Sequence, residues 1–213
     1  MTSNISLSPH FSLSEFTKSA TARSHGIKNE PAPEHVENLK ALCVHTLGPL
    51  REALGLPIII TSGFRTKALN DKLAHSSERS QHMLGQAADF YVGQSPVSGS
   101  RFQVSDDLNH EICDSTRTMS SLLEHCRAQA DSRETQTGDS PMKLETPRQR
   151  LIRAFRLIIL DESIDYDQLI LYPSFIHVSY VSRERNRRTI LLGMRNGKLG
   201  YGKCSVQNAL KIE

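Results

Sequence analysis

Four short apolar runs, each bounded by polar or turn-forming residues, limit the folds that this chain can adopt. They read LPIII at 56–60, AADFYV at 87–92, QLILY at 168–172 and FIHVSY at 175–180. Their length and their content of β-branched residues favour buried strands. Elsewhere apolar residues recur at helical spacing. The pattern predicts an α+β protein, in which a small antiparallel sheet is flanked by helices.

Two helices are predicted in the first quarter of the chain. Ser12 stands three residues before Glu15, which is the spacing of a capping box at the start of a helix. A second helix is expected over about 36–54, where leucines recur on one face. Gly48-Pro49 should kink or split this helix, because proline lacks the N–H group of a helical hydrogen bond.

Further elements follow the first predicted strand. A helix is expected from about Thr66 to Ala74, and another at 146–160, where Thr146 is placed to cap it. The runs on either side of Pro173-Ser174 predict an antiparallel hairpin. A last pair of strands is expected around Asn196-Gly197, which is a favourable turn dipeptide.

The length and composition indicate one domain with an insertion. A chain of 213 residues with 38% hydrophobic residues can bury one core of moderate size. Residues from about 93 to 146 are instead rich in Ser, Gly, Pro, Thr and charged residues. We expect a single domain over residues 1–213 with a polar, partly mobile insertion at about 93–146. A helix at about 106–130 is expected within this insertion.

Charge and cysteine content exclude some function classes. The formal net charge of +3 is too small to indicate a nucleic-acid-binding protein. The basic cluster RERNRR at 183–188 is interpreted as a solvated turn, or alternatively as a site for acidic ligands. The four cysteines lack disulfide-framework spacing, so reduced thiols are expected. No secretory or membrane-spanning segment is recognised, so we expect a protein that is cytoplasmic as synthesised.

The stretch SQHMLGQAAD at 80–89 combines an imidazole with a carboxylate. His82 and Asp89 are residue types that bind zinc, but two ligands do not form a site. His177 is a candidate for the third, because it lies in a predicted strand with its side chain on the opposite face from Ile176 and Val178. Three protein ligands with one open position are typical of a catalytic zinc.

These residues resemble a known family. SQHMLGQAAD is similar to the S-x-H-x-x-G-x-A-x-D motif of the zinc D-alanyl-D-alanine carboxypeptidases, which include VanX-type dipeptidases and phage endolysins. SGFRT at 62–66 and FIHVSY at 175–180 resemble two further segments of that family, and residues 10–31 and 165–170 resemble its phage and Bacteroidetes branch. The resemblance implies a hedgehog/DD-peptidase-like fold.

The resemblance also implies a function. It implies a zinc-dependent hydrolase, a metallopeptidase that acts on peptidoglycan stem peptides containing D-amino acids, as a carboxypeptidase or an endolysin-like enzyme at the cell wall. The implied zinc ligands are His82, Asp89 and His177. Arg65 and Ser80 are the implied substrate-binding residues, since a guanidinium can hold a carboxylate by two parallel hydrogen bonds. The implied partners are stem peptides, without nucleic acid.

The chain departs from the family at the general base. Better-known members carry a glutamate three residues before the last histidine ligand, where this chain has Ser174. If Pro173-Ser174 form a two-residue turn, Ile170 lies opposite His177, and Gln168 shares the metal face. Gln168 is therefore the candidate catalytic residue at this place. Its neutral amide cannot accept a proton as a carboxylate does.

Three alternatives stay open. Glu78, on the loop before the motif, is a second candidate for the base. Without a base, the protein could be a catalytically weak or inactive zinc-containing module that binds cell-wall peptides. A different class of function, an interaction domain, would follow if the insertion held a structural zinc. The candidate ligands for that site are His110, Cys113, His125 and Cys126.

Overall fold

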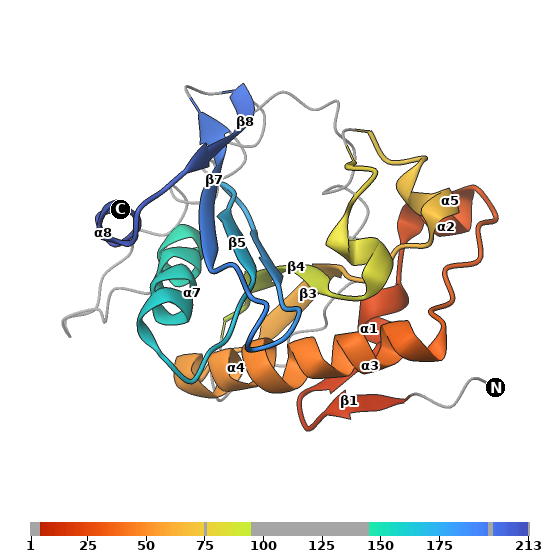
Figure 1. The fold of residues 1–213 in the computed structure, drawn as a ribbon, viewed down its shortest axis with the longest axis horizontal. Helices are drawn as coiled ribbons and strands as arrows, with labels where there is room; N and C mark the ends of the chain where they lie inside the picture. The colour runs from red at the N-terminus through yellow and green to blue at the C-terminus, as the bar shows by residue number, and fades with distance from the viewer. Residues whose placement is uncertain (1–4, 75, 95–144, 196–197, 213) are drawn as a thin grey trace, which may run out of the picture. The chain divides into compact units, whose positions relative to one another are not determined.

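A six-stranded sheet and a two-stranded sheet organise the residues that the structure, a computed structural model, describes: 5–74, 76–94, 145–195 and 198–212 (Figure 1). The small sheet pairs β1 (Ser6–Ser8) with β2 (Phe11–Ser12) in antiparallel orientation. The strands of the large sheet, in spatial order, are β3 (Ile58–Ser62), β4 (Ala87–Val92), β6 (Ile176–Ser179), β5 (Gln168–Leu171), β7 (Thr189–Arg195) and β8 (Lys198–Lys203).

Helices separate the strands along the described chain. They are α1 (Leu13–Thr17), α2 (Ala20–Ser24), α3 (Pro33–Leu42), the π-helix η1 (Cys43–Leu47), α4 (Gly48–Leu54), α5 (Lys67–Asn70), the 3-10 helix η2 (Gln81–Leu84), α7 (Pro147–Leu160) and α8 (Val206–Ala209). The mixture of helices and sheets confirms the predicted α+β class.

The predicted helix starts are present where the sequence places their caps. The N–H of Ser12 donates to Glu15 Oε1 at 2.8 Å before α1, and Thr146 Oγ1 accepts from the N–H of Gln149 at 3.2 Å before α7. The helix expected from Thr66 to Ala74 is shorter than predicted, because α5 ends at Asn70.

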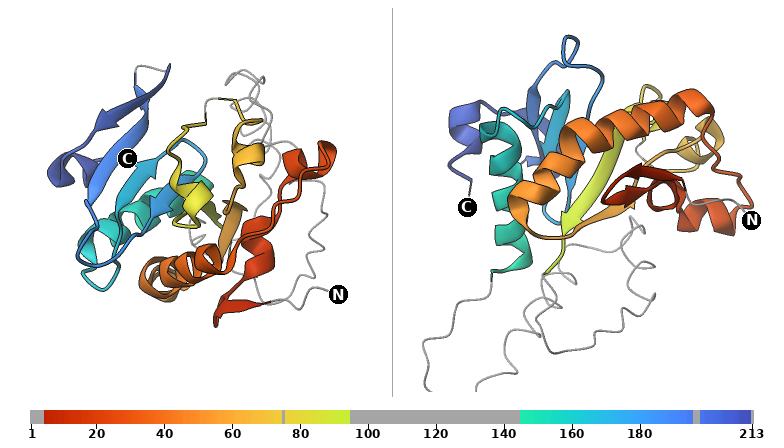
Figure 2. Two further views of the ribbon diagram at one scale, coloured as in Figure 1. Left: turned by 45° about the vertical axis from the view of Figure 1, so that its right-hand side comes forward. Right: turned by 90° about the horizontal axis from the view of Figure 1, so that it is seen from below.

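The disturbance predicted at Gly48-Pro49 takes the form of a π-helical turn. Figure 2 shows α3, η1 and α4 as one long helix whose α4 end lies beside α7. The N–H of Gly48 donates to the carbonyl of Cys43, five residues earlier. A Cβ at position 48 would lie 2.8 Å from that oxygen, so the wide turn needs glycine. The helix thus continues past Pro49 without a break.

One face of the large sheet lies in the hydrophobic core. Leu169 and Leu171 of β5 pack there with α3, α4 and α7. Strand residues alternate between faces, so Gln168 and Ile170 lie on the other face. Ile170 pairs with His177 across the β5–β6 hairpin, as predicted. The sheet thereby presents His177 on the face that the helical core does not occupy.

The large sheet differs from the expected small antiparallel one. Among the described residues it contains six strands, and β7 lies beside β5, to which it runs parallel, and not beside β6. The connection after β6 therefore crosses the start of β5. It is fixed there by the N–H of Thr189, which donates to the carbonyl of Asp167 at 2.9 Å. A local hairpin pattern contains no information about such a crossover, so the sequence could not predict it.

Several predictions concern residues outside the described ranges. The single domain with an insertion at about 93–146 stays a prediction, because residues 95–144 are not described. The same holds for its helix and its proposed zinc ligands. The strands on both sides of the expected Asn196-Gly197 turn are present and antiparallel. Within the described part of the chain, no helix is both long enough and apolar enough to cross a membrane.

Candidate metal and active site

His82 is held by a short helix that ends in a glycine. η2 stops at Gly85, whose φ is +68°, and a Cβ there would lie 2.4 Å from the carbonyl oxygen of His35. Only 3% of His82 is exposed, and its Nδ1 lies 2.7 Å from the carbonyl oxygen of Gly63. Because a carbonyl can only accept, Nδ1 carries the hydrogen, and Nε2 presents a lone pair to the site.

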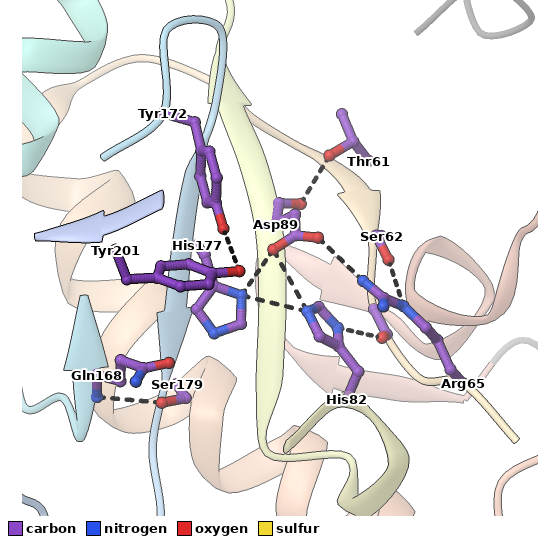
Figure 3. A network of polar contacts seen from close by, with 11 residues as sticks. Thr61, Ser62, Arg65, His82, Asp89, Gln168, Tyr172, His177, Ser179 and Tyr201 are labelled. Atoms are coloured by element: carbon purple, nitrogen blue, oxygen red, sulfur yellow. Dashed lines mark hydrogen bonds and ion pairs between the residues drawn. The ribbon is translucent and has the colours of Figure 1, made fainter. Parts of the chain in front are cut away.

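Asp89 and His177 come from neighbouring strands. They are direct partners in the antiparallel pairing of β4 with β6, so their side chains leave the same face of the sheet. Asp89 Oδ1 lies 2.7 Å from His177 Nδ1 and 3.3 Å from His82 Nε2. The two imidazole nitrogens are 3.2 Å apart. Figure 3 shows the three side chains converging from β4, β6 and η2.

This arrangement fits a metal ion. Zinc binds His and carboxylate ligands at about 2.0–2.2 Å, so two ligand atoms of a tetrahedral site lie roughly 3.3 Å apart. The separations of 3.2 and 3.3 Å to His82 have this value, and the 2.7 Å contact would open by about half an ångström. The three residues form a group of possible metal ligands whose atoms lie within 4.8 Å of one another.

The electrostatics of the group suit a cation. Burial lowers the pKa of His82, so its imidazole is neutral and can act as a ligand. Burial raises the pKa of Asp89, but its close contacts with His82 and His177 outweigh burial and hold that pKa well below its usual range. The site therefore offers the neutral imidazole of His82 and the carboxylate of Asp89 in ligating form.

Arg65 contacts the carboxylate of the proposed ligand set. Its Nη2 lies 3.2 Å from Asp89 Oδ2, and its Nε donates to Ser62 Oγ at 3.1 Å. Asp89 thus turns one oxygen to the guanidinium and the other to the imidazoles. This contact orients the ligating oxygen, as outer-shell partners do in metal sites. Binding of a substrate carboxylate by Arg65 stays a prediction.

The structure also describes the other residues that the sequence analysis singled out for the site. The N–H of Gln168 donates to Ser179 Oγ at 3.1 Å, and Figure 3 shows both residues on strands beside His177. Ser80 precedes η2 without capping it through its side chain. Ser174 is exposed in the β5–β6 turn, and Glu78 is exposed on its loop. The catalytic role of Gln168 and the substrate-binding role of Ser80 stay predictions.

Two tyrosines that the sequence reasoning missed stand beside the metal ligands. Figure 3 shows the hydroxyls of Tyr172 and Tyr201 close to His177, and they lie 3.2 Å apart. Burial, the hydrogen bond with Tyr201 and the negative charge of Asp89 raise the pKa of Tyr172. The predicted register could have revealed Tyr172, because it follows Ile170 by two residues on the metal face.

A buried ion-pair network supports the helix that carries His82. Gln81, its neighbour in η2, donates to Asp167 Oδ2 at 2.9 Å. Asp167 is 1% exposed and also accepts from the backbone N–H of Arg187 at 2.7 Å and from its Nε at 2.9 Å. Three of the four arginines of the RERNRR cluster thus partner buried aspartates, because Arg183 and Arg188 both pair with Asp165. The solvated-turn interpretation did not anticipate these pairs.

Comparison with known proteins agrees with the geometry. The family model for peptidase M15 matches residues 9–121, more than half of the chain. The match includes His82 and Asp89, whereas His177 lies beyond it and reaches the site through the pairing of β6 with β4. Searches of curated proteins and of solved structures returned no match. On the family match, this chain belongs to the peptidase M15 family.

Proposed function

We propose that this protein is a zinc-dependent peptidase that hydrolyses peptidoglycan stem peptides containing D-amino acids. Membership of the M15 family indicates a metallopeptidase, commonly a zinc enzyme. The observation that carries the proposal is the convergence of His82 Nε2, Asp89 Oδ1 and His177 Nδ1. The carboxypeptidase or endolysin type of activity is proposed from the motifs that resemble the D-alanyl-D-alanine carboxypeptidases.

In the proposed hydrolysis, the three ligands would hold the zinc, and Gly63 and Arg65 would hold the ligands in position. Hydrolysis adds water across the C–N bond of the peptide and yields a carboxylic acid and an amine. Zinc held by the three ligands would lower the pKa of bound water to about 7 and polarise the scissile carbonyl. The hydrogen bond to Gly63 fixes the ring of His82, and Arg65 fixes the carboxylate of Asp89.

The chain has no carboxylate at the position expected for the general base. Ser174 occupies the position of the expected glutamate, and it is exposed in a turn. Gln168, on the metal face, has a neutral amide. Loss of one general base typically lowers a rate by about 100- to 10,000-fold. We therefore expect slow turnover with undiminished zinc binding.

The same observation favours a second candidate function. A site that holds zinc and a peptide but has no proton acceptor would be a recognition module for cell-wall peptides. The two functions differ in one outcome, because the module binds stem peptides without cleaving them.

The test measures both binding and cleavage. The zinc-loaded protein is incubated with purified peptidoglycan and with a pentapeptide ending in D-Ala-D-Ala, and released D-alanine and cleaved stem peptides are quantified. We expect cleavage by the parent and by a His25→Ala control, since His25 is an exposed residue that directly follows α2. Cleavage should be lost in His82→Ala and Arg65→Ala. Binding of the pentapeptide without any cleavage would replace the enzyme by the recognition module.

A further inference from the structure

The ring of Tyr172 is fixed at the end of β5. Its N–H donates to the carbonyl of Phe175 at 3.0 Å and closes the β5–β6 turn. Its carbonyl accepts from Arg148 Nη1 at 3.1 Å. The ring stacks on Phe175 with a centroid distance of 4.3 Å and an interplanar angle of 15°. The backbone and the ring are therefore both held in place.

Gly193 of β7 leaves the space into which this ring extends. A Cβ at position 193 would lie 2.3 Å from Cδ1 of Tyr172, which is closer than any side chain tolerates. The Tyr172 ring therefore reaches across the backbone of β7. On the far side of β7, Tyr201 of β8 meets it, and the two hydroxyls lie 3.2 Å apart. Three strands, β5, β7 and β8, build this tyrosine pair.

The tyrosine pair faces the metal ligands. Figure 3 shows both hydroxyls beside His177 and on the same side of the sheet as Asp89. Tyr201 is 61% exposed, so a ligand can reach it from solvent. One hydroxyl–hydroxyl hydrogen bond uses one of the two phenolic protons, so the second proton can be donated to a ligand. Arg65 contacts Asp89 from the other side of the site.

We propose that the tyrosine pair, Tyr172 and Tyr201, binds the peptide at the metal site by donating a hydrogen bond to a carbonyl oxygen of its backbone. Tyr201 makes the contact, and Tyr172 is a positioning residue that orients the Tyr201 hydroxyl. This inference rests on the proposed function, because it assigns the pair to the same peptide. A neutral donor is suited to a peptide carbonyl, whereas a carboxylate would be held by a cation.

The test uses the spectroscopic properties of this chain. It contains five tyrosines and no tryptophan, so intrinsic fluorescence reports the tyrosines directly. The zinc-loaded protein is titrated with the D-Ala-D-Ala pentapeptide, and affinity is also measured by calorimetry. The variants are Tyr201→Phe, Tyr172→Phe and Gly193→Ala. The control is Tyr180→Phe, whose buried ring stacks on His45 of η1 on the core side of the sheet.

We expect each of the three variants to bind the pentapeptide about 3- to 10-fold more weakly than the parent, the range of one neutral hydrogen bond. Zinc content should be unchanged, because the ligand set is intact. The change in tyrosine fluorescence on binding should persist in Tyr180→Phe and decrease in Tyr201→Phe. In Gly193→Ala, the introduced methyl group should displace the Tyr172 ring and reproduce the weaker binding of Tyr172→Phe.

Three outcomes would overturn the inference, and they are distinguishable. Equal affinities of Tyr201→Phe and the parent would remove the tyrosine pair from the peptide site and leave the proposed function intact. A zinc-loaded parent that neither binds nor cleaves the pentapeptide would refute the inference together with the proposed function. Loss of zinc from Tyr201→Phe would also contradict it, since the pair would then support the ligands rather than the peptide.

Discussion

Two carboxylates with little exposure to solvent, Asp89 in β4 and Asp167 before β5, have different hydrogen-bond partners. Each carboxylate is shielded from water, and each pairs with an arginine, Arg65 or Arg187. The contacts of Asp167 described above come from N–H donors: the backbone and guanidinium of Arg187 and the amide of Gln81. Its lone pairs are therefore occupied by hydrogens.

Asp89 differs in the partners of its second oxygen. Asp89 Oδ1 faces His177 Nδ1 and His82 Nε2, and the latter carries a lone pair because Nδ1 donates to Gly63. A cation can bind between Asp89 Oδ1 and the lone pair of His82 Nε2. The oxygens of Asp167 already accept hydrogen bonds from Arg187 and Gln81, so they are not arranged to bind a cation. An arginine partner thus does not distinguish a structural carboxylate from a functional one. The presence of neighbouring lone pairs does.

Asp89→Asn should have the largest effect on function. The amide is a weaker ligand than the carboxylate, and we expect zinc affinity to fall by at least about 100-fold, beyond the 10- to 100-fold typical of outer-shell changes. Competition with a chromogenic zinc chelator measures it. Asp71→Asn, on an exposed carboxylate of α5's end, is the control. Unchanged zinc affinity in Asp89→Asn would remove Asp89 from the ligand set.

Asp167→Asn should affect stability instead of zinc binding. The change weakens charge-assisted hydrogen bonds from Arg187, and because that guanidinium is half exposed we expect a loss of about 1–3 kcal/mol in the free energy of unfolding. Urea denaturation of the metal-free protein measures the loss, and the folded variant should bind one zinc as the parent does. An Asp167→Asn variant that is as stable as the parent but binds no zinc would contradict this prediction, because Asp167 would then support the metal site and not the fold.

Arg65→Lys tests whether the arginine at Asp89 orients the ligand. A lysine keeps the charge but cannot contact Asp89 Oδ2 and Ser62 Oγ with the planar geometry of a guanidinium. We expect zinc affinity to fall about 10-fold, the lower end of outer-shell effects. Arg23→Lys, at an exposed position on α2, should bind zinc as the parent does. Equal affinity in Arg65→Lys and the parent would assign Arg65 to the substrate alone.

The smallest effect is expected in the pH dependence of stability. Burial raises the pKa of Asp167, but hydrogen bonds from Arg187 and Gln81 outweigh it and lower that pKa below its usual value. A lowered pKa in the folded state stabilises the protein above the unfolded pKa of about 3.9, and this contribution is lost as pH falls through the folded value. The stability difference between the parent and Asp167→Asn should therefore narrow below about pH 4. A difference independent of pH would show that the charge of Asp167 contributes nothing.

The sequence predicted those parts of the molecule that depend on local patterns. The capping residues Ser12 and Thr146 and the register of Ile170 opposite His177 follow from short-range chemistry, and the structure has them. The convergence of His82 with Asp89 and His177 was expected from motifs. The caps and the hairpin register are set by one turn or one hairpin. The convergence of the three ligands instead depends on the pairing of β6 with β4, and only the resemblance of the motifs predicted it.

The parts that the sequence did not predict depend on contacts between distant segments. The parallel pairing of β5 with β7 brings Gly193 beneath the ring of Tyr172, and an irregular register between β7 and β8 follows. Tyr201 could not be assigned to the site without this pairing. The arginines at 183–188 were interpreted as solvated because their partners, Asp165 and Asp167, lie 18 to 23 residues earlier in the chain, and no local pattern links them.

Zinc stoichiometry tests the central claim most directly. The metal content of the purified parent, His177→Ala, the exposed-residue control His25→Ala and Cys113→Ser is measured under identical conditions. We predict one zinc per chain in the parent, in His25→Ala and in Cys113→Ser, and none in His177→Ala. Zinc retained by His177→Ala but lost from Cys113→Ser would contradict the account and place the metal in the segment at 93–146.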